Sequence, residues 1–432
     1  MLKRKIYDDL IKWKDSLDKK AILLKGSRHV GKTYIVNYFA KENYTNLIHL
    51  DFENNPKLRS IFDGELDLGT LTKQISLKLQ TEKMVPNKTL IFLDEVHLCP
   101  RARMAVTNLT AQDKYDVIMA TSAYGMNIDN FPLELNPNEQ LMNLYGLDFE
   151  EFLWANSINL NVIEQIKTHF IAETSVPSVL HDAVMELLKE YTVIGGMPKV
   201  VDVFTTKHNF KSALKIQKEI LKDYMRQMQM YLSKVESRKT SLCFNSIPKQ
   251  LEKTNKKFMY GVVEELSNAR KYEKSILNLH DSDLIEISFN LTEPKWPFRN
   301  QVKYDVFKVY LKDIGLLTSM YGAEAQQSIM DGDFSYKEFA ILESLVADIL
   351  IKGNHKLYYF SKNATLDVEF VLKLFNRVTA ISVNHADNTK AKALDSVYEN
   401  YGVKSAIKLS MTNKFEIDTF VKMPIYMAMF LQ

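Results

Sequence analysis

A short stretch near the start of the chain combines residue types that can bind an anion. Residues 26–33 read Gly-Ser-Arg-His-Val-Gly-Lys-Thr and fit the pattern G-x-x-x-x-G-K-[ST] at every fixed position. Glycines let backbone N–H groups surround an anion, and the N-terminus of a following helix attracts negative charge. We therefore expect Lys32 to reach the outer phosphates of a nucleotide and the Thr33 hydroxyl to bind Mg²⁺. The residues predicted to contact the nucleotide in this loop are Gly26, Ser27, Arg28, His29, Val30, Gly31, Lys32, Thr33 and Tyr34.

Two acidic residues follow an apolar run further along the chain. Residues 89–93 read Thr-Leu-Ile-Phe-Leu, which is typical of a buried strand, and Asp94 and Glu95 come directly after it. Parallel α/β sheets bind ligands at the carboxyl ends of their strands. We expect Asp94 to bind Mg²⁺, directly or through water, and Glu95 to orient or deprotonate the water that attacks the γ-phosphate. Glu95 and Lys32 are thus the predicted catalytic residues. Acids that only cap a strand are the alternative, and the position of the pair about sixty residues after a complete phosphate loop argues against it.

Other polar residues could add to this site. Ser122 ends another apolar run, where it could sense the γ-phosphate or simply satisfy the strand end. Asp51 and Glu53 follow a further strand-like run and could belong to the site or to a solvated strand end. Arg101 and Arg103 lie just beyond the acidic pair. Either could act as an arginine finger from a neighbouring subunit, although surface or packing roles are the plainer interpretation.

The pattern around these residues indicates the elements that position them. Residues 21–24 predict a strand directly before the loop, and the apolar spacing of residues 34–40 predicts a helix after it. Residues 1–20 predict another helix. Helical patterning over residues 156–215 fits a helical lid, and residues 216–240 predict one long helix rich in methionine.

Length and composition set the class of protein. A chain of 432 residues is too long for one core, and 46% hydrophobic and 25% charged residues are ordinary for a soluble protein. The net charge of +3 argues neither for nor against nucleic acid, and only Cys99 and Cys243 are present, which favours a reducing compartment. We find no signal-peptide pattern and no run near the roughly 20 apolar residues of a membrane span. We therefore expect a cytoplasmic protein with no membrane contact.

The ordered series of motifs resembles a group of predicted bacterial and archaeal ATPases of the AAA superfamily. These proteins join an N-terminal P-loop domain to a C-terminal domain of unknown function that is similar to PD-(D/E)xK nucleases. The resemblance is carried by residues 25–34, 91–97, 99–103, 121–125, 147–155, 191–198, 245–251, 256–258 and 312–317.

Three positions need comment against that pattern. The family usually has Gly-Ser after the third strand, and here Thr121-Ser122 makes Ser122 the matching residue. His97 stands where glutamine is frequent, so we assign it a structural role. Residues 196–198, Gly-Met-Pro, resemble a signature of signal-transduction NTPases with numerous domains, although the chain alone indicates only a turn. The resemblance implies that Pro198 contacts the nucleotide.

Residues 241–330 look like a winged helix. The pattern predicts a second helix at 268–279, a strand from 284 to 289 and a return strand near 303–308. Basic residues gather in this region and could contact nucleic-acid phosphates. Because acidic residues interleave with them, we favour a solvated interdomain face. The basic residues are Lys249, Lys253, Lys256, Lys257, Arg270, Lys271 and Lys274.

Residues 331–432 predict a helix, three strands, a helix and a strand, similar to the nuclease-like core of the family. Such a nuclease binds a metal through acids and uses a lysine to activate water. Glu343 and Asp367 match the first two acidic positions, but Ser382 and Asn384 stand where glutamate and lysine are needed. Glu369 alternates with Asp367 on the expected strand and could substitute as a ligand, but nothing replaces the lysine. We predict a nuclease-like fold without nuclease activity.

The predicted fold class is α/β: a P-loop NTPase parallel sheet with a helical lid, a winged helix and a C-terminal α/β nuclease-like domain. The expected boundaries are 1–155, 156–240, 241–330 and 331–432. The leading hypothesis is an ATP-binding protein whose Mg²⁺-dependent ATPase activity makes it a nucleotide-controlled switch. The alternative is a nucleotide-regulated DNA-binding or protein-interaction scaffold with negligible turnover. ATP and Mg²⁺ are the expected cofactors, DNA or a protein client is the expected partner, and the oligomeric state is open.

Overall fold

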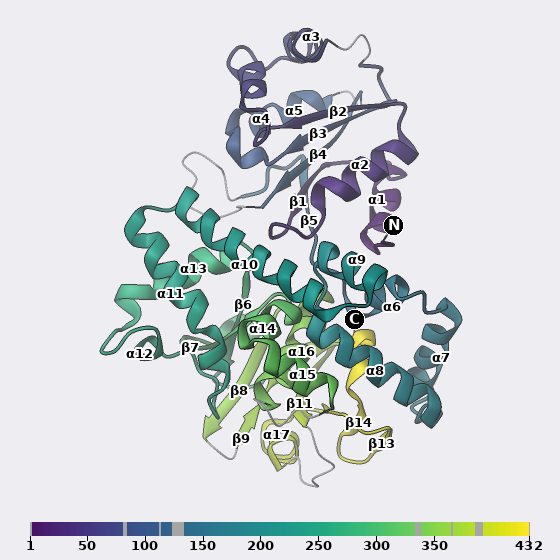
Figure 1. Ribbon diagram of the computed structural model, residues 1–432, viewed down its shortest axis with the longest axis vertical. Coiled ribbons are helices and arrows are strands. Elements are labelled where there is room, and N and C mark those ends of the chain that lie inside the picture. Colours follow the sequence, from purple (N-terminus) through teal and green to yellow (C-terminus); the bar gives the residue numbers. More distant parts are fainter. Residues whose placement is uncertain are drawn as a thin grey trace.

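The computed structural model in Figure 1 describes residues 2–80, 84–111, 114–122, 134–332, 338–363, 366–384 and 392–431. Its N-terminal unit contains the predicted parallel sheet, which is confirmed, with strand order β2-β3-β4-β1-β5. Every residue of β3 is buried, as expected for a strand covered on both faces. The strands are β1 (Ala21–Lys25), β2 (Asn46–Asp51), β3 (Thr89–Asp94), β4 (Asp116–Thr121) and β5 (Glu139–Asn143).

Alternate strand residues feed two hydrophobic cores, one on each face of this sheet. Ile22 and Leu24 point to the face covered by α1 and α2, whereas Leu23 points to the face covered by α3, α4 and α5. The strand period of two residues accounts for this division. The helices are α1 (Ile6–Lys14), α2 (Lys32–Asn43), α3 (Leu68–Leu79), α4 (Pro100–Met104) and α5 (Val106–Leu109).

A helical layer lies below this sheet in Figure 1. It comprises α6 (Phe149–Ala155), α7 (Leu160–Ile171), α8 (Ser178–Ile194), α9 (Pro198–Lys207), α10 (Phe210–Tyr231), α11 (Lys234–Leu251), α12 (Tyr260–Val263) and α13 (Ala269–Asp281). The single helix expected at 216–240 is wrong, because the chain breaks between α10 and α11. Ser233 caps α11 by accepting a hydrogen bond from the backbone N–H of Glu236. The sequence Ser-x-x-Glu carries that signal.

The chain below the helical layer forms two more sheets. A hairpin of β6 (Ile285–Leu291) and β7 (Val302–Leu311) lies in a sheet of order β7-β6-β8-β9, with β8 (Tyr358–Asn363) and β9 (Leu366–Val368). The other sheet has order β10-β11-β12-β14-β13. Its strands are β10 (Phe370–Leu374), β11 (Arg377–Asn384), β12 (Ser405–Ser410), β13 (Glu416–Ile417) and β14 (Val421–Pro424). The accompanying helices are α14 (Ile314–Tyr321), α15 (Ala323–Met330), α16 (Glu338–Lys352) and α17 (Lys392–Tyr401).

Two expected boundaries coincide with shared elements. Helix α11 is continuous through residues 240 and 241. Strand β6, from the expected winged helix, pairs in parallel with β8, from the expected nuclease-like domain. The expected strand 366–372 is also wrong, because the chain bends at Glu369: β9 pairs with β8, and β10 pairs with β11. Asp367 and Glu369 therefore do not alternate on one strand.

Buried charges join the helical layer to the chain below it. Lys352 of α16 has a fully buried ammonium that lies 2.8 Å from Asp348 Oδ1 and 3.5 Å from Asp313 Oδ2. The Tyr191 hydroxyl of α8 donates to Asp348 Oδ2 at 2.6 Å, and Asp313 accepts from the backbone N–H of Gly196 at 2.7 Å. One continuous hydrophobic core surrounds this network. Among the described residues, no helix has the length and apolar content needed to cross a membrane.

Candidate functional site

The loop between β1 and α2 depends on two of its glycines. Gly31 has φ of +95°, a left-handed conformation that non-glycine residues rarely adopt, and α2 begins at the next residue. A Cβ on Gly26 would lie 2.2 Å from the carbonyl oxygen of Leu144. A larger residue at either position would therefore distort the loop and move the backbone N–H groups that begin α2.

Lys32 is held over this loop. The residue is 5% exposed, and its ammonium donates hydrogen bonds to the carbonyl oxygens of Gly26 and Ser27, each at 2.9 Å. Burial lowers the pKa of Lys32, and the nearby carboxylates of Glu95 and Asp94 act in the opposite direction. A cation held only by neutral carbonyls in a buried position is suited to an incoming phosphate.

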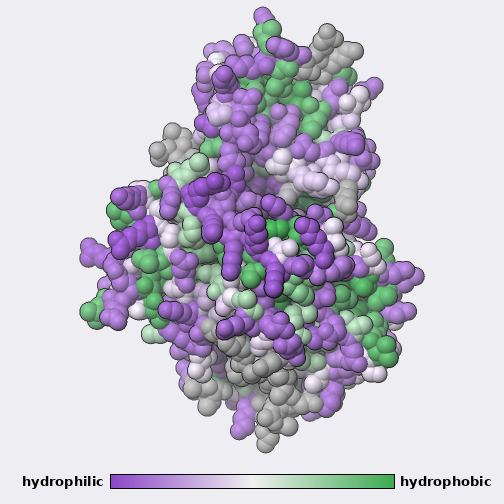
Figure 2. All heavy atoms as spheres, viewed as in Figure 1, coloured by the Kyte–Doolittle hydropathy of each residue, from purple (hydrophilic) through white to green (hydrophobic). Residues whose placement is uncertain are grey.

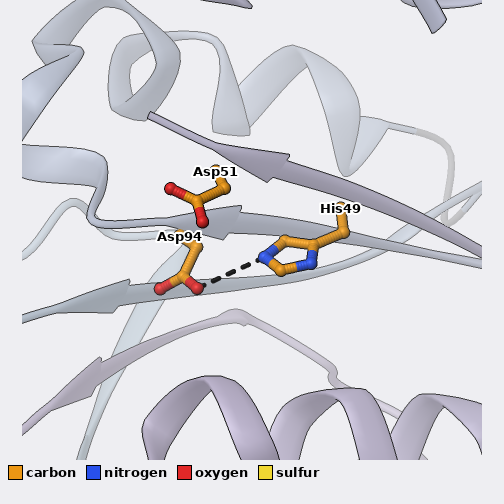
Figure 3. Close-up of side chains that lie close together, drawn as sticks. All are labelled: His49, Asp51 and Asp94. Atoms are coloured by element: carbon orange, nitrogen blue, oxygen red, sulfur yellow. Dashed lines mark hydrogen bonds and ion pairs between the residues drawn. The ribbon is translucent and has the colours of Figure 1, made fainter. Parts of the chain in front are cut away.

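Thr33 and Asp94, the two predicted metal ligands, are in direct contact. The Thr33 hydroxyl donates to Asp94 Oδ2 at 2.8 Å. Figure 3 shows His49 pointing at the same carboxylate, with His49 Nε2 3.2 Å from Asp94 Oδ2. Asp51 lies beside Asp94 in the parallel register of β2 and β3, and one ligand atom from each of these three side chains lies within 4.8 Å of the others. A hydroxyl and carboxylates are the hard oxygen donors that Mg²⁺ prefers.

His49 is therefore a positioning residue for Asp94 that sequence reasoning missed. Its ring stacks on Phe92 with centroids 4.7 Å apart, which fixes its direction. A hydrogen bond to a metal-binding carboxylate orients that ligand. Alternation along β2 places His49 and Asp51 on one face of the strand, which is a signal that the sequence did contain.

We expect His49→Ala to weaken divalent-cation binding by about tenfold, because loss of an orienting hydrogen bond typically lowers metal affinity by one to two orders of magnitude. Mn²⁺ can serve as a spectroscopic probe of the site in the presence of ATP. His169→Ala is the matched control, since His169 is a half-buried histidine far from the site whose ring contacts the Thr174 hydroxyl. Equal Mn²⁺ affinity in both variants would contradict the role given to His49.

Glu95 meets Ser122 at the ends of β3 and β4. The Ser122 backbone N–H donates to Glu95 Oε2 at 2.9 Å, and its hydroxyl lies 2.8 Å from both carboxylate oxygens. Burial raises the pKa of the Glu95 carboxyl, but Lys32, His97 and the Ser122 hydrogen bonds outweigh it, so the net pKa is lowered. Glu95 is therefore an ionised carboxylate at neutral pH, as a base or water-orienting group requires.

His97 was assigned a structural role, and the structure brings it against the site. Its Nδ1 lies 3.3 Å from Glu95 Oε2 and 3.1 Å from the Thr121 hydroxyl, and its Nε2 lies 3.4 Å from the Tyr231 hydroxyl of α10. Burial lowers the pKa of His97 to about 4, so the ring is neutral. This contact links the end of α10 to Glu95.

Helices α9 and α10 close the site from the side of the helical layer. A cavity of about 610 Å³ is lined by Lys32, Thr33, Asp94 and Glu95, and also by Pro198, Lys199 and Asp202 of α9. A Cβ on Gly31 would lie 3.6 Å from Pro198 Cγ, so the first residue of α9 lies over the loop. The other predicted residues lie within or beside the same loop: Ser27 and Val30 are buried, and Tyr34 is 55% exposed and lines the cavity.

Several charged side chains contact the phosphate loop in ways that the sequence analysis did not predict. Arg28 of the loop forms a two-point ion pair with Glu53, and its Nε lies 3.4 Å from Asp223 of α10. His29 Nε2 lies 2.9 Å from the same Asp223. Arg4 donates to the carbonyl oxygen of Val30 at 3.1 Å. These contacts join residues far apart in the sequence, and spacing alone does not indicate them.

The two arginines considered as fingers have partners within the chain. Arg103 is buried against Glu139, with Nη2 2.7 Å from Oε2, so it serves packing. Arg101 donates to the carbonyl oxygens of Phe62 at 2.6 Å and Gly64 at 2.8 Å. Arg103 therefore has a packing role, whereas Arg101 is exposed and contacts these carbonyl oxygens from the surface; the arginine-finger interpretation of Arg101 stays a prediction.

The sheet order, the loop and the acidic strand end are those of a P-loop domain. Residues 18–153 match the AAA domain family, and residues 185–327 match a domain of unknown function (DUF8612). The second match spans α9, α10 and the β6–β7 hairpin as one unit. No curated protein has significant sequence similarity to this chain.

Solved structures of similar proteins are distant. A Walker-type ATPase of Pyrococcus abyssi is 14% identical over 74% of this chain and 96% of its own, with a TM-score of 0.42. The ORC1 protein of Aeropyrum pernix, solved in complex with DNA, is 12% identical over 76% of this chain and 91% of its own, with a TM-score of 0.29. A signal-transduction ATPase with numerous domains from Pyrococcus horikoshii is 14% identical over 82% of this chain and 48% of its own, with a TM-score of 0.27.

Proposed function

We propose that this protein binds and hydrolyses ATP with Mg²⁺ and acts as a nucleotide-controlled switch. One observation carries the proposal: Lys32, Thr33, Asp94 and Glu95 line a single cavity at the carboxyl ends of the parallel strands. That cavity also contains residues of α9, so a bound nucleotide would contact the P-loop domain and the helical layer together. A ligand can shift such an arrangement only through contacts that differ between its two states, and the γ-phosphate supplies that difference.

The roles follow from the contacts. Lys32 and the backbone N–H groups that begin α2 would bind the phosphates. Thr33 and Asp94 would hold Mg²⁺, which neutralises phosphate charge when bound. The Glu95 carboxylate would accept a hydrogen bond from the attacking water and take its proton, while Ser122 orients that carboxylate. Pro198 would contact the nucleotide from α9.

We expect Lys32→Ala to lower ATP affinity by about 10- to 100-fold, because a charge-assisted hydrogen bond in a buried site contributes roughly 1.5–3 kcal/mol. Lys41→Ala is the matched control, since Lys41 lies on the same helix and is exposed. ATP-dependent thermal stabilisation reports binding, and phosphate release reports turnover. If both variants keep wild-type stabilisation and turnover, nucleotide binding at this loop is wrong.

The contacts of Glu95 also favour a second function, a nucleotide-regulated DNA-binding or protein-interaction scaffold with negligible turnover. Both oxygens of the Glu95 carboxylate are hydrogen-bonded to Ser122, so water has to compete for them. A protein that is stabilised by ATP yet releases no phosphate under any condition would support the scaffold and contradict the ATPase.

We also propose that the C-terminal unit has a nuclease-like fold without nuclease activity. Glu343 forms ion pairs with two buried lysines. Lys256 Nζ lies 2.6 Å from Glu343 Oε2, and Lys308 Nζ lies 3.0 Å from Glu343 Oε1. These cations lower the pKa of Glu343 and occupy the oxygens that a metal would need. The sequence analysis searched for a replacement of the lysine that is missing at Asn384 only within residues 331–432. Both of these lysines lie earlier in the chain, so the analysis missed them. Among the residues that the structure describes, Asp367 Oδ1 and Glu369 Oε2 are buried and have no hydrogen-bond partner.

A further inference from the structure

Helix α10 carries a row of cations. Its basic residues are Lys211, Lys215, Lys218, Lys222 and Arg226, and all five are exposed. At 3.6 residues per turn they fall within an arc of about 80° and extend over about 22 Å of helix axis. Figure 1 shows α10 crossing the front of the molecule, and Figure 2, in the same view, shows strongly hydrophilic side chains over the middle of that face.

The opposite face of α10 anchors this row. It is buried in the core through Ala213, Gln217, Ile220, Tyr224, Gln227 and Met228. Asn209 caps the helix by accepting a hydrogen bond from the backbone N–H of Ser212. The cations are therefore presented from a rigid support.

Few carboxylates neutralise the row. In the part of the chain that the structure describes, Lys211, Lys215, Lys218 and Lys222 form no ion pair, whereas Arg226 pairs with Asp223. Asp223 is shared with Arg28 and His29 of the phosphate loop, which leaves Glu219 as the other acid on this helix. Lys199 of α9 joins the row near its end, where it lines a cavity of about 390 Å³ with Lys222 and Arg226 and with the two acids of the helix, Glu219 and Asp223. This concentration of positive charge contrasts with a whole-chain net charge of only +3.

We propose that the α10 row binds the phosphate backbone of a double-stranded nucleic acid. A duplex offers phosphates every 3.4 Å along each strand, and roughly 22 Å of straight helix can follow several of them. Lysines on flexible stems adapt to such a backbone as point charges. Contacts between these cations and phosphates position a duplex without reading its base sequence.

Other polyanions fit this surface less well. Single strands are usually held by aromatic side chains that stack on bases, and the residues of the row are all aliphatic cations. A membrane-surface helix needs an apolar face free to enter lipid, and the apolar face of α10 is in the core. The cations of α13, at the predicted winged helix, are interrupted by acids: Lys271 pairs with Glu264.

The test measures binding of the full chain to a duplex. Fluorescence anisotropy of a labelled duplex of about 20 base pairs reports the binding at several salt concentrations. For wild type, the logarithm of the association constant should fall linearly with the logarithm of the salt concentration. The slope should be about −4 to −5, since each phosphate neutralised by one of the five cations contributes about −0.9. Lys215→Glu/Lys222→Glu should weaken binding at least about tenfold and reduce that slope by about 2. Lys215→Gln/Lys222→Gln is a milder version should the charge reversal impair folding.

Matched variants with the same charge change decide whether the effect is local. Lys73→Glu/Lys78→Glu alters two exposed lysines of α3, at the far end of the molecule, and should leave affinity within about twofold of wild type. Arg270→Glu/Lys274→Glu makes the same charge change on α13 and should likewise leave the affinity within about twofold of wild type. Three results would overturn the proposal: no salt-dependent binding by wild type, an equal loss in the α3 or α13 variant, or binding to phosphatidylserine vesicles or single strands in preference to the duplex.

Discussion

Replacing Glu95 with glutamine is expected to lower ATP turnover by about 10²- to 10⁴-fold, the usual contribution of a positioned acid or base. The amide keeps the shape of the carboxylate and can still accept a hydrogen bond from the Ser122 backbone N–H, which now lies 2.9 Å away. It cannot accept a proton from water. Lys32, Thr33 and Asp94 are untouched, so ATP binding should persist within about threefold.

Single-turnover phosphate release and ATP-dependent thermal stabilisation separate these two effects. Glu42→Gln is the matched control, because Glu42 is an exposed acid on α2 in the same domain. Turnover of Glu95→Gln within threefold of this control would remove Glu95 from the chemistry. Loss of ATP binding in Glu95→Gln would instead indicate a structural role for that carboxylate.

Replacing Lys352 with methionine is expected to lower the free energy of unfolding by about 3–5 kcal/mol, as the loss of one partner of a buried ion pair usually does. The change would leave Asp348 and Asp313 buried beside each other without their cation. Burial already raises the pKa of Asp348 to about 6 with Lys352 in place. Without the ammonium this carboxyl would hold its proton at neutral pH in the folded state.

The proton on Asp348 decides whether the stability of Lys352→Met rises or falls with pH. The folded variant would bind a proton that the unfolded chain releases near its ordinary pKa of about 3.9, so stability should fall as pH rises from about 5 to 8. Urea unfolding at both ends of this range measures it. Lys356→Met changes an exposed lysine that lies after the end of α16; it is the control and should lose less than about 0.5 kcal/mol.

A double variant keeps the result interpretable. Asp348→Asn/Lys352→Met removes the Lys352–Asp348 ion pair and should recover part of the stability lost by Lys352→Met, because Asp313 is then the one carboxylate of the network left without the ammonium, and it keeps hydrogen bonds from the backbone N–H groups of Gly196 and Leu316. If Lys352→Met is as stable as Lys356→Met, the buried network is not what joins α16 to the helical layer.

Short-range sequence patterns predicted the chemistry of the P-loop domain. The spacing from Gly26 to Thr33 and the acids after β3 each depend on a few adjacent residues, and a parallel sheet brings the carboxyl ends of its strands to one edge. Lys32, Thr33, Asp94, Glu95 and Ser122 accordingly lie where these patterns predicted. Their roles in binding and hydrolysis stay predictions. Ser233 shows the same kind of local signal, which the sequence analysis missed. The four residues from Ser233 to Glu236 form the Ser-x-x-Glu pattern that caps α11 and separates it from α10.

The supporting contacts had no such local pattern. Asp223 reaches the phosphate loop from α10, His97 lies between Glu95 and Tyr231, and Lys308 pairs with Glu343. Each contact joins residues separated by tens to hundreds of positions, and only the packing of layers selects which side chains meet. The pairing of β6 with β8 likewise followed from tertiary structure, because an edge strand accepts whichever neighbour the fold presents.

What the sequence by itself determined is therefore the phosphate loop, the acidic strand end and the α/β class, since glycine conformation, strand periodicity and residue chemistry act over a few neighbouring positions. Only the tertiary structure decided the partners of the charges and the way the units share a helix and a sheet. Burying a charge costs free energy unless a complementary group is close, and whether one is close depends on the whole fold.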